Sequence, residues 1–187
     1  MIARPSVTLV FLAVCLAALS LHPGDGAYAA PAADTPTARV HWAIDAGGGG
    51  GGDPEAVARA VLAKQADALG LAAVLDGLEF VSARESLLAH HVRFRQTVGG
   101  VPAADGEVVV SLSKRDDSAR VFNSTRPVAG DPPARQPRIA SDGALDAAWA
   151  RLRVHGALLT VPHAALVQVP DGSSWRLAYA VDIGSTA

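Results

Sequence analysis

The sequence predicts an α+β protein of two small subdomains, each an antiparallel sheet with a packed helix. Alternating apolar and polar residues over 90–98 and 174–183 have the two-residue period of half-buried strands. Apolar residues three and four apart after Asp53 and after Ser141 predict one helix before each group of strands. A proline-rich stretch at 128–137 separates the two groups, so we place the subdomain boundary there.

Residues 1–29 have the pattern of a secretory signal peptide. Arg4 precedes an apolar run that ends at Leu21, and small residues lead to a predicted cleavage between Ala29 and Ala30. The run is too short to span a bilayer comfortably, since a membrane helix needs about 20 apolar residues. A lipoprotein signal at Cys15 fits poorly because the apolar run continues past it. We therefore expect a secreted protein with no membrane attachment after cleavage and, since Cys15 is the single cysteine, no disulfide.

Residues 30–52 are rich in Ala, Pro, Thr and Gly and end in six consecutive glycines. A glycine run loses the most backbone entropy on ordering, so we predict a flexible leader. A phosphate-binding loop would need a Lys-Ser or Lys-Thr pair after the glycines, and the sequence has none there.

The first predicted subdomain covers 53–127. Asp53 can cap a helix that has Pro54 at its first position and Gly70 at its end. Its core stripe comprises Ala58, Val61, Leu62, Gln65, Ala66 and Leu69. The strands expected after it are 78–86, 90–98, 106–113 and 119–123.

The second predicted subdomain covers 138–187. Ser141 is expected to cap a helix with Leu145, Ala148, Trp149 and Leu152 on its core stripe. Strands are expected at 158–161, 164–169 and 174–183. Only four residues follow Ile183, so the last strand is expected to have an open edge, as in a truncated product.

The sequence favours a protein without catalytic or cofactor chemistry. A net charge of −2 with no basic run argues against nucleic acid as a partner. The His-Glu-x-x-His spacing of zinc proteases is absent, and His90 and His91 are adjacent on a strand, where they face opposite sides. No nucleophile motif such as Gly-x-Ser-x-Gly occurs. We therefore expect no metal and no other cofactor; Asn123 begins a glycosylation pattern that matters only in a eukaryotic secretion route.

The stretch from His91 to Glu107 resembles the fungalysin/thermolysin propeptide (FTP) domain, whose pattern runs approximately His-x-Arg-Phe-x-Gln-x-Tyr-x-Gly-Val-Pro-Val-x-Gly-Gly-Glu. The matching residues are His91, Arg93, Phe94, Gln96, Gly100, Val101, Pro102, Gly106 and Glu107. Val98 replaces the usual Tyr, and Ala103, Ala104 and Asp105 replace a Val-x-Gly segment. We interpret Arg93, Phe94 and Gln96 as residues that build the sheet. We favour this interpretation over direct contact with a partner.

Residues 139–183 are similar to the PepSY module that follows the FTP module in such precursors, although they stop before its final strand. The resemblance implies a non-catalytic prosegment of a secreted metalloprotease, whose partner is the protease catalytic domain in cis or in trans, and which acts as chaperone and inhibitor. Two alternatives remain open. One is a stand-alone secreted protein-binding module, and the other is a metal-dependent hydrolase built on His90, His155 and His163.

Overall fold

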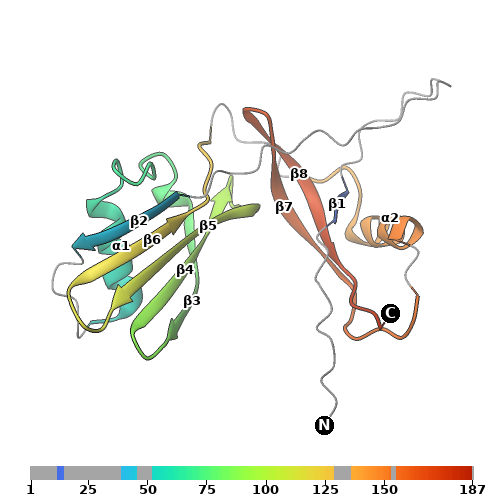
Figure 1. The fold of residues 1–187 in the computed structure, drawn as a ribbon. Helices are drawn as coiled ribbons and strands as arrows, with labels where there is room; N and C mark the ends of the chain where they lie inside the picture. The colour runs from blue at the N-terminus through green and yellow to red at the C-terminus, as the bar shows by residue number, and fades with distance from the viewer. Residues whose placement is uncertain (1–11, 15–38, 46–51, 129–135, 153–154, 187) are drawn as a thin grey trace, which may run out of the picture. The chain divides into compact units, whose positions relative to one another are not determined.

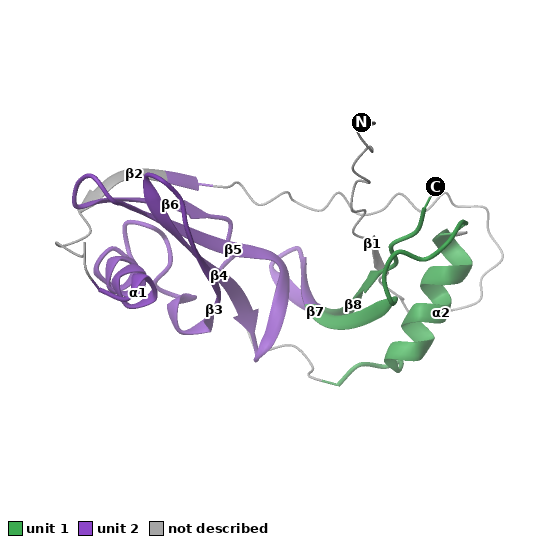
Figure 2. Ribbon diagram, turned by 90° about the horizontal axis from the view of Figure 1, so that it is seen from below, with its two compact units in different colours: residues 1–27, 134–167, 177–187 green, residues 28–133, 168–176 purple. Residues whose placement is uncertain are grey.

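The computed structural model describes residues 12–14, 39–45, 52–128, 136–152 and 155–186 (Figure 1). The described chain is α+β, with two α-helices, a short 3-10 helix and a mixed sheet. Residue contacts divide it into two compact units. The larger unit comprises Tyr28–Pro133 and Gln168–Arg176, and the smaller unit comprises Met1–Ala27, Ala134–Val167 and Leu177–Ala187 (Figure 2).

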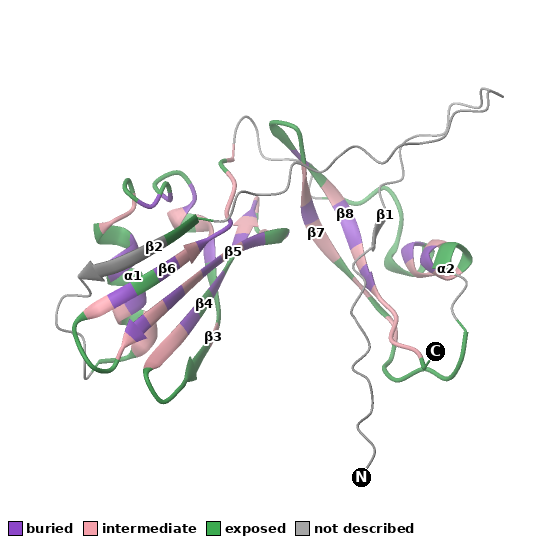
Figure 3. Cartoon of the chain, in the orientation of Figure 1, coloured by how far each residue is buried: buried purple, intermediate pink, exposed green. Residues whose placement is uncertain are grey.

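The larger unit contains an antiparallel sheet in the order β2-β6-β5-β4-β3. The strands are β2 (Arg39–Asp45), β3 (Leu78–Glu85), β4 (Ala89–Val98), β5 (Val101–Ser113) and β6 (Ser118–Asn123). One face of this sheet is covered by α1 (Pro54–Lys64) and by the turns that follow it, which end in the 3-10 helix η1 (Leu75–Gly77) (Figure 1). Strands β4, β5 and β6 alternate buried side chains with half-buried or exposed ones (Figure 3), and most of the buried ones form a core with α1. The unit is therefore a two-layer structure with one face of its sheet toward solvent.

Helix α1 begins as predicted and ends earlier. The Asp53 side chain accepts a hydrogen bond from the Glu55 amide, at 3.4 Å, and Pro54 is the first helical residue. The helix ends at Lys64, so the prediction of an end at Gly70 is wrong. Residues 65–70 turn instead, with Gly70 at φ +68°, and this places Leu69 in the core at 1% exposure.

The smaller unit contains α2 (Ser141–Leu152), most of strands β7 (His163–Asp171) and β8 (Ser174–Asp182), and β1 (Leu12–Val14). Its core joins two alanines of the helix to two residues of β8 and comprises Ala144, Ala148, Tyr179 and Val181. The small residues face the strands because they let the helix approach closely, whereas Leu152, predicted on the core stripe, is 39% exposed. Ser141 is the first helical residue rather than the cap.

Three further predictions differ from the structure. Residues 158–161 form no strand beyond one bridge from Leu158 to Ser185, and Val161 is 86% exposed. Part of the segment expected to be a flexible leader forms β2, because the outer edge of β6 offers it backbone hydrogen-bonding groups. The edge of β8 expected to be open pairs with β1, which lies within the predicted signal peptide. The rest of that peptide, its cleavage site at Ala29 and most of the predicted linker lie outside the described residues.

Candidate functional site

The FTP-like residues lie on β4, on β5 and on the tight turn between these strands. Gly99 and Gly100 form the turn with φ values of +60° and +81°, a region that β-carbon-bearing residues rarely enter. Beyond the turn, β5 is continuous from Val101. The sequence predicted that the chain restarts at Val101 and that the strand begins only at Gly106. Because successive side chains alternate across a strand, the motif divides into a buried set and a solvent-facing set.

Phe94 is the centre of the buried set. Its side chain is fully buried, with the edge of Phe80 against it at a ring-centroid distance of 6.2 Å. The Arg59 guanidinium of α1 covers the ring from 4.9 Å, within the range of a cation–π contact. Arg59 also pairs with Glu55 at 2.8 Å. Phe94 therefore joins the helix layer to the sheet.

Gln96 holds the chain that leaves β6. Its side chain is fully buried; Nε2 donates to the Arg126 carbonyl at 2.7 Å, and Oε1 accepts from the Arg126 amide at 3.0 Å. A side-chain amide thus satisfies both backbone groups of one residue outside any strand. A β-carbon on Gly106 would lie 2.5 Å from Gln96 Oε1, so this glycine is required by the close approach of Gln96.

Arg93 and Glu107 face solvent on neighbouring strands. Two guanidinium–carboxylate contacts join them, at 2.6 and 2.7 Å, in a bidentate pair. The Glu107 amide donates to Ser124 Oγ at 3.1 Å, and the Ser124 amide donates to the Glu107 carbonyl at 2.9 Å. With its side chain and backbone both engaged, Glu107 ties β4 and β5 to the end of β6.

His91 is engaged by two hydroxyl groups. Its Nδ1 lies 2.9 Å from Ser111 Oγ, and its Nε2 lies 3.1 Å from Ser86 Oγ. Both ring nitrogens therefore have hydrogen-bond partners within the sheet and the β3–β4 loop. In the part of the chain that the structure describes, no three His, Cys, Asp or Glu side chains gather into a group that could hold a metal ion.

Two of the four departures from the FTP pattern, Val98 and Ala103, lie together. Val98 and Ala103 are buried at 1% and 4% exposure, and they pack with Trp175 of β8 in a small separate cluster. Two small side chains at these positions leave space for one indole from far along the chain. The alternation over 174–183 predicted only that the apolar face carrying Trp175 must be covered, and it did not indicate this contact.

Asn123 is a buried structural residue. It is 6% exposed; Nδ2 donates to the Leu69 carbonyl at 2.9 Å, and Oδ1 accepts from the Thr125 amide at 2.9 Å. The glycosylation pattern that it begins is therefore inaccessible in the folded protein. Ser124 and Arg126 are the partners of the motif that the sequence did not reveal, since a segment that follows a strand gives no periodic pattern.

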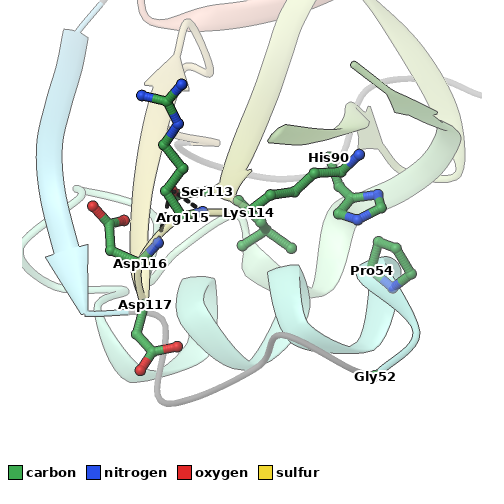
Figure 4. Close-up of a pocket in the computed structure, with 9 residues that line it drawn as sticks. Gly52, Pro54, His90, Ser113, Lys114, Arg115, Asp116 and Asp117 are labelled. Carbon is green, nitrogen blue, oxygen red and sulfur yellow. Dashed lines mark hydrogen bonds between the residues drawn. The ribbon is translucent and has the colours of Figure 1, made fainter. Parts of the chain in front are cut away.

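A polar pocket of about 300 Å³ lies at the far end of the larger unit's sheet (Figure 4). His90 and Pro54 line one side, and Asp116 and Asp117 line the other. Lys114 beside it pairs with Glu85 and donates to the Ser86 carbonyl at 2.8 Å. The Lys114 hydrogen bond and charge lower the pKa of Glu85, and hydrogen bonds from Ser118 and Ser113 lower that of Asp116. Both carboxylates are solvated, and their lowered pKa values favour the charged form, which does not suit a general acid.

Residues 89–125 match the family model of the fungalysin/thermolysin propeptide motif, which confirms the resemblance over β4, β5 and β6. No curated protein matches the chain. The motif is that of propeptides of thermolysin- and fungalysin-type proteases. No helix within the described ranges is long and apolar enough to cross a membrane.

Proposed function

We propose that the chain is the non-catalytic prosegment of a secreted thermolysin- or fungalysin-like metalloprotease, and that it acts as folding assistant and inhibitor of the catalytic domain. The match of residues 89–125 to the propeptide motif carries this proposal. The geometry supports it, because Phe94, Gln96 and Glu107 are all used in holding the sheet together. Motif residues that hold the fold together define a scaffold. This suits a prosegment, because a prosegment acts through surface complementarity rather than through bond chemistry.

The predicted organisation becomes part of this proposal. It assigns 1–29 to the signal peptide, 30–52 to a leader that includes β2, 53–127 to the FTP-like domain, 128–137 to the linker and 138–187 to a PepSY-like module. The helix and two-stranded core of the smaller unit support the last assignment. Secretion and a protease partner in cis or in trans follow from the prosegment role.

Exposed apolar side chains mark the surface that we assign to the protease. Leu87 and Leu88 in the β3–β4 loop are 92% and 49% exposed, and Val81 on the edge strand β3 is 43% exposed. Burying an exposed apolar side chain against a partner is favourable. Apolar groups on one loop and one strand edge therefore favour protein binding. The β3–β4 loop is also tied down by the Lys114–Glu85 pair, so the two leucines are presented on an ordered turn.

The test is refolding of the thermolysin-like catalytic domain made by the source organism. The domain is unfolded in denaturant and diluted with or without the purified chain, and cleavage of a fluorogenic peptide reports the recovered activity. We expect a higher yield of folded protease, and a lower cleavage rate while the chain remains bound. The Leu87→Ser/Leu88→Ser variant should lose most of this effect, whereas Val161→Ser, a matched change at an 86% exposed site, should retain it.

The opposite outcome has a definite meaning. If neither yield nor inhibition changes with chain concentration, although the chain is folded by circular dichroism, the prosegment role is wrong. The stand-alone secreted binding module then takes its place.

A further inference from the structure

A second pocket, of about 240 Å³, lies in the larger unit where the chain leaves β6 and the tip of the β7–β8 hairpin meets it. All of its lining residues belong to that unit: Arg126, Pro127, Pro170, Gly172, Ser173, Ser174 and Trp175. Pro127, Pro170 and Trp175 present mainly apolar surface, and Arg126 is a cation. A volume of this size accommodates one side chain or one terminal residue of a peptide, being roughly eight times the share of one water in the liquid.

Arg126 is held in the wall of this pocket with an unused donor. Its Nε is buried and has no hydrogen-bond partner. Buried polar groups are nearly always paired, and this nitrogen has no acceptor among the described residues. Gln96 fixes the Arg126 backbone through both its amide and its carbonyl, so the point from which the side chain starts is held in place.

Two carboxylates close to the lining residues along the chain or through Ser124 are already engaged. Asp171, which adjoins Pro170 in the sequence, pairs with Arg176. Glu107, which is bonded to Ser124 next to this segment, pairs with Arg93. The acceptor that Arg126 requires therefore comes from neither of them.

Gln168 is a second buried polar side chain of the larger unit without a hydrogen-bond partner among the described residues. It is fully buried with neither amide atom hydrogen-bonded, and it pairs along the sheet with Ala103. Ala103 packs against Trp175, which is a wall of the pocket. In the described ranges, the buried side-chain nitrogen and oxygen atoms without a partner are those of Arg126 and Gln168 alone.

We propose that this pocket binds a carboxylate of an extended peptide, with Arg126 as the ion-pair donor and Pro127, Pro170 and Trp175 as the apolar wall. Guanidinium is the side chain best suited to a carboxylate because its donors match the two oxygens. A peptide brings its carboxylate either on an Asp or Glu side chain or at its C-terminus. The inference does not depend on the protease role, since any such peptide satisfies the same donor.

The test titrates three short peptides into the full chain and follows the Arg126 Nε–H and Trp175 indole N–H signals by nitrogen–proton correlation NMR. One peptide is capped at both ends and contains Asp, one is uncharged with a free C-terminal carboxylate, and one is the capped Asn analogue of the first. We expect saturable shifts with one or both carboxylate peptides, which identifies the source, and none with the Asn peptide.

Arg126→Gln should weaken binding about tenfold or more, because one charged hydrogen bond contributes about 1.5–3 kcal/mol. It keeps the backbone bonds to Gln96, and Arg126→Lys, which preserves the charge, serves if Arg126→Gln is unstable. Arg115→Gln, in the other pocket, is the matched control and should bind as the parent does. Equal shifts with the Asn peptide, or undiminished binding by Arg126→Gln, overturn the proposal. No refolding of a protease is involved, so this test and that of the prosegment role fail independently.

Discussion

Replacing Gln96 by Leu tests whether the motif glutamine holds the fold together. Leu keeps a similar volume and removes both amide atoms, so the Arg126 amide and carbonyl lose the partners now at 3.0 and 2.7 Å. Each hydrogen bond contributes about 0.5–1.5 kcal/mol net, and a buried group left unpaired costs about 1–3 kcal/mol. Leu regains part of this through apolar burial at a fully buried site. We expect the free energy of unfolding to fall by about 3 kcal/mol.

Urea unfolding followed by far-ultraviolet circular dichroism measures the effect. The midpoint should fall while the dependence of the free energy on urea stays unchanged, since the surface exposed on unfolding is the same. Gln136→Leu makes the identical chemical change at an exposed position and should alter stability by less than about 0.5 kcal/mol. A loss below about 1 kcal/mol for Gln96→Leu would refute the structural role argued from the two hydrogen bonds.

Three other changes test neighbouring features. Gly106→Ala should cost about 1–3 kcal/mol in urea unfolding, because its β-carbon would lie 2.5 Å from Gln96 Oε1; an unchanged midpoint would show that Gln96 moves freely. Gln168→Met should raise the unfolding free energy by about 1 kcal/mol, since the buried amide has no partner, and a loss would reveal one. The Lys114 hydrogen bond lowers the pKa of Glu85 below 4.5, so its stabilisation is complete above pH 4.5 and is lost as the pH falls through the lower folded value. Glu85→Gln should therefore flatten the acid decline of the thermal midpoint, and parallel curves for variant and parent would contradict this.

The sheet of the larger unit was the most predictable part of the fold. Residues 92–98 alternate strictly, and the structure buries Val92, Phe94, Gln96 and Val98 on one side. The family pattern includes Phe94 and Gln96 of this set, and residues 89–125 match the family model. Where local pattern and tertiary packing agree, sequence alone is sufficient.

Elsewhere local pattern and packing disagree. The α1 stripe continues past Lys64 in sequence, yet the chain turns there because Leu69 and Leu71 reach the core only after a turn. Residues 158–161 are apolar enough for a strand, but the structure gives them one isolated bridge, from Leu158 to Ser185, which lies outside the named strands. The partners of the motif, Ser124 and Arg126, follow the last strand of the sheet, where no period exists to predict them.

The burial of Asn123 bears on how the protein can be produced. In a eukaryotic secretory host, Asn123-Ser124-Thr125 is an acceptor while the chain is still unfolded. A sugar attached at that moment occupies the amide nitrogen that otherwise bonds the Leu69 carbonyl, and it is far too large for a side chain that is 6% exposed. Such a host therefore divides its product into an unmodified folded fraction and a glycosylated fraction in which β6 cannot dock beside the α1 layer. The two fractions differ in mass. The ratio of unmodified to glycosylated protein therefore measures the rate of folding relative to the rate of modification.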